Sequence, residues 1–190
     1  MADTKIALAN IALDLIGAAT ILSFDDDSNE ARIVKRMYES SKKTVLRSHP
    51  WNCARKRVVL SPLTELPAFA FSYKFKLPTD CLRILPYASL VGTSYEIDQR
   101  HLLCDLETIN LQYIANVTDT TLFDALVDDA IATKLASNIC YRLVQSTSLA
   151  EKMSSDYERI LRRAKTMNAQ EQQEQSLQSE TWLDSRLQGV

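Results

Sequence analysis

The chain has 190 residues, of which 46% are hydrophobic and 24% charged, and a formal net charge of −2 at pH 7. This composition is ordinary for a globular protein, and the charge gives no global electrostatic case for nucleic-acid binding. With only 3 glycines, a glycine-rich phosphate loop is nearly excluded. The 4 cysteines show no CxxC spacing, so we expect free thiols in a reducing cytoplasm and neither a metal site nor a cofactor. We also expect no signal peptide and no membrane span.

Residues 1–48 predict two helices. After a cap at Asp3 or Thr4, the apolar side chains over residues 6–16 recur at helical spacing and cover most of the girth. This pattern is typical of a helix buried on more than one side, by its own fold or by a neighbouring subunit. A second helix is expected at 28–47, preceded by Asp25-Asp26-Asp27. We interpret these acids as charges at the positive end of that helix, because a calcium loop would alternate its ligands.

Residues 48–57, with the sequence SHPWNCARKR, predict a corner where the helical pattern stops. Pro50 disfavours helix at the preceding residue and cannot donate a backbone hydrogen bond. Trp51 offers a large apolar surface with a single N–H donor. We therefore expect Pro50 and Trp51 to anchor a joint between two layers of the structure.

Residues 53–117 predict a small, mostly antiparallel β region. A strand at 53–60 carries Arg55, Lys56 and Arg57, and residues 69–77 alternate aromatic with small or lysine side chains, which is the clearest strand pattern in the chain. Such an aromatic ladder could stack single-stranded bases, but we prefer a layer that buries its aromatic face. The remaining strand patterns lie at 82–85, in a hairpin over 95–104, and at 109–113.

Two further helices are expected at 122–146 and from the Thr147-Ser148 break to about residue 167. Residues 168–180 are rich in glutamine and glutamate with little apolar content, so we expect the helix to fray or project there. After them, Trp182, Leu183, Arg186 and Leu187 make the end of the chain amphipathic, as in a docking peptide.

The predicted fold class is therefore α+β: an antiparallel-type four-helix bundle, with two N-terminal and two C-terminal helices, a small inserted antiparallel β region and an extended C-terminal tail. The predicted domains are the helical bundle (1–48 with 119–175), the β insertion (49–118) and the docking tail (176–190).

No catalytic group stands out in the sequence. Ser48 and His49 are adjacent, but the GxSxG context of a nucleophilic serine is absent. The carboxylates at 25–27 and 128–129 are what acid-rich helices offer by chance, whereas a glycosidase holds two carboxyls at a defined distance in a cleft. We expect no catalytic, cofactor-binding or metal-binding residues, and hence no enzyme.

Several short sequences, in a particular order, carry a resemblance that covers nearly the whole chain. They are residues 49–57, 73–83, Tyr95-Glu96-Ile97, Tyr113-Ile114, Val117-Thr118-Asp119 and 182–186. In these the chain resembles the tail tubular protein A family, the head-to-tail adaptor proteins of short-tailed (podovirus-type) bacteriophages. It departs from the family at Gln99-Arg100, where hairpin turns of the family often contain a glycine.

The resemblance implies a structural virion protein that forms a ring, usually of twelve copies, which joins the portal to the tail nozzle and continues the DNA channel. The implied partners are the portal protein, a nozzle protein of the tail tubular protein B type and, as a further candidate, a tail fibre or tailspike, with no membrane. Portal docking is assigned to Trp182, Leu183, Arg186 and Leu187. The implied location is the portal-proximal tail of the virion, after assembly in the host cytoplasm.

Genomic DNA passing through such a ring would be contacted only non-specifically, and Arg55, Lys56 and Arg57 are the candidate contacts with DNA or with a partner.

Two other functions stay open. One is a tail-associated glycan hydrolase, because some tail proteins of this kind have been proposed to cut host polysaccharide. The other is a nucleic-acid-binding module that uses the strand at 53–60 and the aromatic ladder, whose affinity would fall steeply with added salt.

Overall fold

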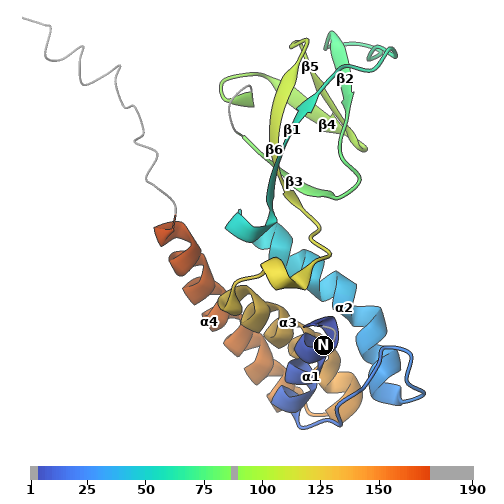
Figure 1. Cartoon of the computed structure of the whole chain (residues 1–190), viewed down its shortest axis with the longest axis vertical. Helices are drawn as coiled ribbons and strands as arrows, with labels where there is room; N and C mark the ends of the chain where they lie inside the picture. The colour runs from blue at the N-terminus through green and yellow to red at the C-terminus, as the bar shows by residue number, and fades with distance from the viewer. Residues whose placement is uncertain (1–3, 87–89, 172–190) are drawn as a thin grey trace, which may run out of the picture.

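A computed structural model describes residues 4–86 and 90–171, with the strands at one end of an elongated molecule and most of the helices at the other (Figure 1). The described helices are α1 (Thr4–Ile16), α2 (Asn29–Ser48), α3 (Ala125–Val144), α4 (Thr147–Gln170) and the short 3-10 turns η1 (Asn52–Ala54) and η3 (Thr120–Leu122). The described strands are β1 (Arg55–Leu60), β2 (Tyr73–Lys76), β3 (Cys81–Leu85), β4 (Tyr95–Asp98), β5 (His101–Cys104) and β6 (Ile109–Ala115). None of these helices is long and apolar enough to cross a membrane.

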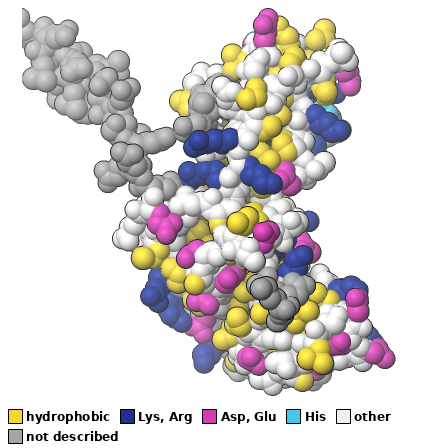
Figure 2. All heavy atoms as spheres, viewed as in Figure 1, with side chains coloured by type: hydrophobic (Ala, Val, Ile, Leu, Met, Phe, Trp, Pro, Cys, Tyr) yellow, Lys and Arg dark blue, Asp and Glu magenta, His cyan; other side chains and the backbone are white. Residues whose placement is uncertain are grey.

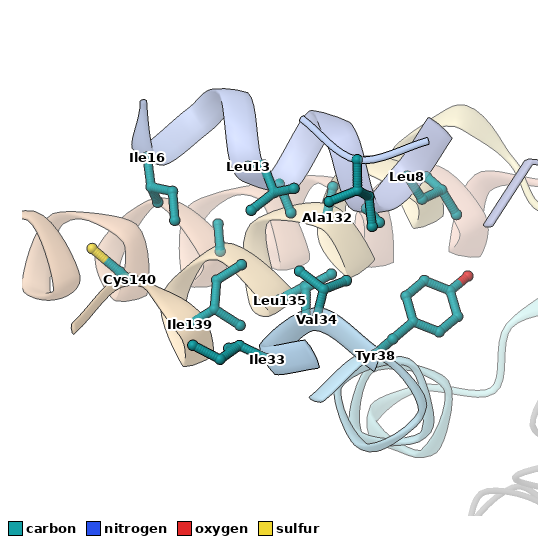
Figure 3. Packing of buried hydrophobic residues seen from close by; sticks show 14 of the residues in the cluster. Leu8, Leu13, Ile16, Ile33, Val34, Tyr38, Ala132, Leu135, Ile139 and Cys140 are labelled. Atoms are coloured by element: carbon teal, nitrogen blue, oxygen red, sulfur yellow. The ribbon is translucent and has the colours of Figure 1, made fainter. Parts of the chain in front are cut away.

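The expected antiparallel four-helix bundle, with its N-terminal and C-terminal helix pairs, is wrong. Among the described helices α3 is central: α1, α2 and α4 each pack against it, while their backbones hardly approach one another. Moreover, α1 runs in the same direction as α3, since Leu8 lies toward the Ala132 end of α3 and Ile16 toward Cys140 (Figure 3). The prediction paired helices that are neighbours in sequence, whereas alanines buried on both α1 and α3 let these two come close.

The β region consists of two three-stranded antiparallel sheets within the described residues, with strand orders β1-β6-β3 and β2-β5-β4. In the first sheet β1 pairs with β6 so that Arg55 lies opposite Ile114. The two sheets share a hydrophobic core, in which Phe75 and Leu102 from one sheet and Leu111 from the other are buried. The β region is therefore a small layered structure with a core of its own.

The hairpin expected over 95–104 is confirmed, and β4 and β5 form it with Asp98 opposite His101. Its tip contains no glycine. Instead, Gln99 takes a positive φ of 54°, a left-handed conformation that glycine adopts more easily than other residues. The chain thus makes the turn at some conformational cost.

The long strand expected over 69–77 is wrong, because the observed strand β2 has only four residues. Its partner β5 is equally short, and beyond it Asp105 turns back to accept a hydrogen bond from the Ser72 backbone N–H at 2.8 Å. Ala70 has a φ of 70°, which breaks the extended backbone, and Phe69 is 82% exposed. The alternating aromatics therefore form no continuous ladder on which bases could stack.

The three aspartates before α2 lie as the sequence indicates. Ser28 caps the helix by accepting a hydrogen bond from Ala31 N at 3.1 Å. Asp25 pairs with Lys35 at 2.6 Å, Asp27 pairs with Arg32, and Asp26 accepts backbone hydrogen bonds from the preceding turn. The acids are thus engaged with the helix and its entry turn.

Candidate functional site

The candidate site is the joint where α2, β6, α3 and α4 meet around Trp51. The indole of Trp51 is fully buried and shares a core with Leu46 of α2, Ile114 of β6 and Ile131 of α3. Its Nε1–H donates to the backbone oxygen of Val45 at 2.9 Å, which satisfies the only polar group of the ring. Proline stops α2 just before this point, so the tryptophan enters the core directly after the helix ends.

Strand β6 links the joint to the sheets because both of its faces are buried. Leu111 and Tyr113 point into the core between the sheets, whereas Ile114 belongs to the core around Trp51. The Tyr113 hydroxyl donates to Asp80 Oδ1 at 3.1 Å. Burial, together with the charge and hydrogen bond of Asp80, raises the pKa of Tyr113 to about 12. The same strand therefore serves two cores and holds them together.

A polar clamp from the last turn of α4 closes the joint. The Asn52 backbone N–H donates to Asn168 Oδ1 at 3.0 Å, and Asn52 Nδ2 donates to Glu171 Oε2 at 3.2 Å. Asn168 Nδ2 lies 3.1 Å from His49 Nε2, so the amide can donate to a neutral imidazole. These contacts join residues more than a hundred positions apart and fix the end of the described chain against the corner.

His49 lies between the clamp and the tryptophan. Its ring meets that of Trp51 edge-on, with centroids 4.8 Å apart. Burial lowers the pKa of His49, and the positive charges of Lys165, Arg83 and Arg55 lower it further. Ser48 Oγ instead donates to Val45 O at 2.7 Å, so these two residues are not arranged as a nucleophile and its base.

A pocket of about 310 Å³ opens beside the clamp. Its lining includes Trp51, Phe123, Asp124 and Glu171. Next to it, burial and the neighbouring charges of Asp129 and Asp124 raise the pKa of Asp128 to about 6. Within residues 4–86 and 90–171, no group of His, Cys, Asp or Glu is arranged to hold a metal ion. The pocket is lined by apolar and polar side chains alike, with the carboxylates of Asp124 and Glu171 among them.

The structure does not bring the three basic residues of β1 onto one surface. Alternation along the strand puts Lys56 on the opposite face from its two neighbours. Arg55 Nη2 donates to Pro50 O at 3.2 Å, which turns this side chain toward the joint. Lys56 forms an ion pair with Asp80 at 2.7 Å.

The proposed portal-docking residues Trp182, Leu183, Arg186 and Leu187 lie outside the described residues. The division of the chain at 48/49, 118/119 and 175/176 stays a prediction.

Sequence reasoning missed the clamp of Asn52 with Asn168. The composition from residue 168 onward predicted that the helix frays or projects there, and α4 is observed to continue to Gln170. The one available signal was the apolar stripe of this helix, which extends as far as Met167. No family model matches this chain, and no curated protein matches it.

Proposed function

We propose that the protein is a structural virion protein, a head-to-tail adaptor whose copies form a ring between the portal and the tail nozzle. The observation that carries this proposal is the apolar outer face of α1. Ile11 and Leu15, one helical turn apart, are 44% and 43% exposed, while Leu13 on the opposite side is fully buried. A helix that is apolar on both sides needs a partner for the side its own fold leaves open.

Other exposed apolar side chains support contact between copies at this end of the molecule. Leu22, in the loop after α1, is 90% exposed, and Tyr141 near the end of α3 is 59% exposed. Ile16 and Cys140 lie at the same end of the helical core (Figure 3), so Leu15 and Tyr141, their neighbours in sequence, belong to that end too. A contact between different faces of neighbouring copies generates a closed ring when the rotation between them closes.

The partners follow from the resemblance. The ring, of twelve copies, joins the portal protein to a nozzle protein of the tail tubular protein B type, in the portal-proximal tail of the virion after assembly in the host cytoplasm. The tail residues Trp182, Leu183, Arg186 and Leu187 dock on the portal. The role is structural and requires no catalysis.

Deletion of residues 177–190 is expected to weaken binding to isolated portal rings at least about tenfold, because burial of a tryptophan and two leucines contributes about 1.5–3 kcal/mol each. The measurement is a titration of the full-length and truncated proteins against immobilised portal. The matched control is the double variant Gln178→Ala/Gln188→Ala, which alters the same tail without removing an apolar group. Equal affinity of the truncated and full-length proteins would show that the tail is not the portal-docking segment.

A further inference from the structure

Basic side chains gather at the waist between the sheets and the helices (Figure 2). Two arginine side chains form hydrogen bonds between the helical part and the sheets. Arg47, at the end of α2, donates from Nη1 to the backbone oxygen of Leu82 at 2.6 Å. Arg83, in β3, donates from Nη1 to the backbone oxygen of Arg47 at 3.2 Å. Both guanidinium groups are therefore held in place by carbonyl groups, which leave most of their N–H donors available.

Further cations lie next to this pair. Arg55 of β1 and Lys165 of α4 are close enough to His49 for their charges to lower its pKa, as does Arg83. The Nε of Arg55 is buried and has no hydrogen-bond partner within the described residues. We call Arg47, Arg55, Arg83 and Lys165 the waist belt. They come from four separate elements: Arg55, Arg83 and Lys165 lie around the His49 imidazole, and Arg47 is joined to Arg83 through its backbone oxygen.

Among the described residues, no carboxylate forms an ion pair with the cations of the waist belt, whereas carboxylates pair with several cations elsewhere. Clustered like charges disfavour one another, and a bound anion relieves that repulsion. A guanidinium group that carbonyl oxygens hold in one orientation is also preorganised to donate two parallel hydrogen bonds to a phosphate.

We propose that the waist belt binds the phosphate backbone of duplex DNA. This deepens the proposed function and rests on it for the source of the DNA, since the ring encloses the genome's path. Duplex DNA presents a regular row of charges, one per about 1.7 Å of helix axis, that a band of cations can follow. The acidic C-terminal segment of this chain is a poorer match, because residues 172–190 carry three acids and one arginine.

The belt replaces the basic strand as the DNA contact. Lys56 is already paired with Asp80, and only Arg55 of the three basic residues in β1 belongs to the cluster around His49. Because these cations would contact phosphates and not bases, we expect the binding to be independent of the DNA sequence.

Fluorescence anisotropy with a duplex of about 30 bp, titrated with the full-length protein between about 50 and 200 mM salt, tests the belt. Four phosphate contacts predict a slope of log affinity against log salt of about −3.6. The double variant Arg47→Ala/Arg83→Ala should reduce the steepness by about 2 and weaken binding about tenfold or more at the lower salt. The matched control is Arg32→Ala/Lys35→Ala, which removes two paired cations near the start of α2 and should leave the slope unchanged.

A pH series gives a second readout. The groups that face His49 are Arg55 of β1, Arg83 of β3, and Lys165 with Asn168 of α4. Phosphates that neutralise these cations raise the pKa of His49 again, so binding takes up a proton. Affinity should therefore rise as the pH falls from about 8 to about 6, and His49→Gln should reduce that dependence.

Because Arg47 and Arg83 also tie α2 to β3, loss of folding could imitate loss of binding. Lys165→Ala removes a belt cation that takes no part in the link between α2 and β3, and it should reduce the steepness by about 1 in a protein of unchanged melting temperature. Unchanged slopes in the folded belt variants would overturn the proposal, as would equally tight binding of an acidic peptide. Belt variants that lose DNA but still assemble on portal would leave the ring in place. A protein that binds DNA but never assembles on portal would refute the adaptor function instead.

Discussion

Trp51→Ala should lower the free energy of unfolding by about 3–5 kcal/mol, the range for truncating a fully buried aromatic side chain. The indole lies in the core shared by Leu46, Ile114 and Ile131, so its removal leaves a cavity that both the helices and the sheets border. It also removes the hydrogen bond to Val45 O. Equilibrium unfolding in denaturant, followed by circular dichroism, measures the loss.

Trp51→Phe is the matched control for this cavity. It keeps most of the apolar volume and removes the Nε1–H donor. Val45 O still accepts a hydrogen bond from Ser48 Oγ at 2.7 Å, so the lost bond should cost only about 1 kcal/mol. If Trp51→Ala were as stable as the wild type, the tryptophan would not anchor the joint.

Leu135→Ala should cost about 2–5 kcal/mol, because this leucine is fully buried at the centre of the core between α1, α2 and α3 (Figure 3). In a helical core built around α3, a cavity at this position removes contacts with several helices at once. The melting temperature and the denaturant midpoint both report the effect.

Leu149→Ala removes the same atoms from a half-buried position near the start of α4, at the edge of the same core. It should cost less than half as much as Leu135→Ala, because a half-exposed side chain buries less apolar area. Equal costs for the two leucines would contradict the central position of α3.

Elements whose signals are local could be predicted from the sequence. The second helix was expected at 28–47 and is observed at Asn29–Ser48, because Ser28 supplies the cap and Pro50 the stop. The hairpin over 95–104 was likewise visible as two short alternating runs around a polar turn. Burial of Trp51 could be expected from its size and from its place next to a helix end.

The arrangement of the helices could not be predicted in the same way, because it depends on non-local packing. The apolar stripe on α1 indicates that the helix is buried, but it does not indicate that the helix packs against α3 and not against α2. The strand predicted over 69–77 was too long for a related reason. A strand extends only where a partner strand pairs with it, and β5 ends at Cys104.

The site was predictable in part as well. The corner at Pro50 and Trp51 was visible in the sequence, whereas the partners of Asn52 lie 116 and 119 positions away in α4. The same holds for the waist belt, whose members are spread from residue 47 to residue 165 and meet only in the folded chain.

Native mass spectrometry of the protein with and without portal rings tests the adaptor function most directly. The account predicts that portal gains a full ring of copies, twelve by the resemblance, each adding 21.5 kDa, in one cooperative step. A portal that gains no mass at saturating concentrations of the full-length protein would contradict it.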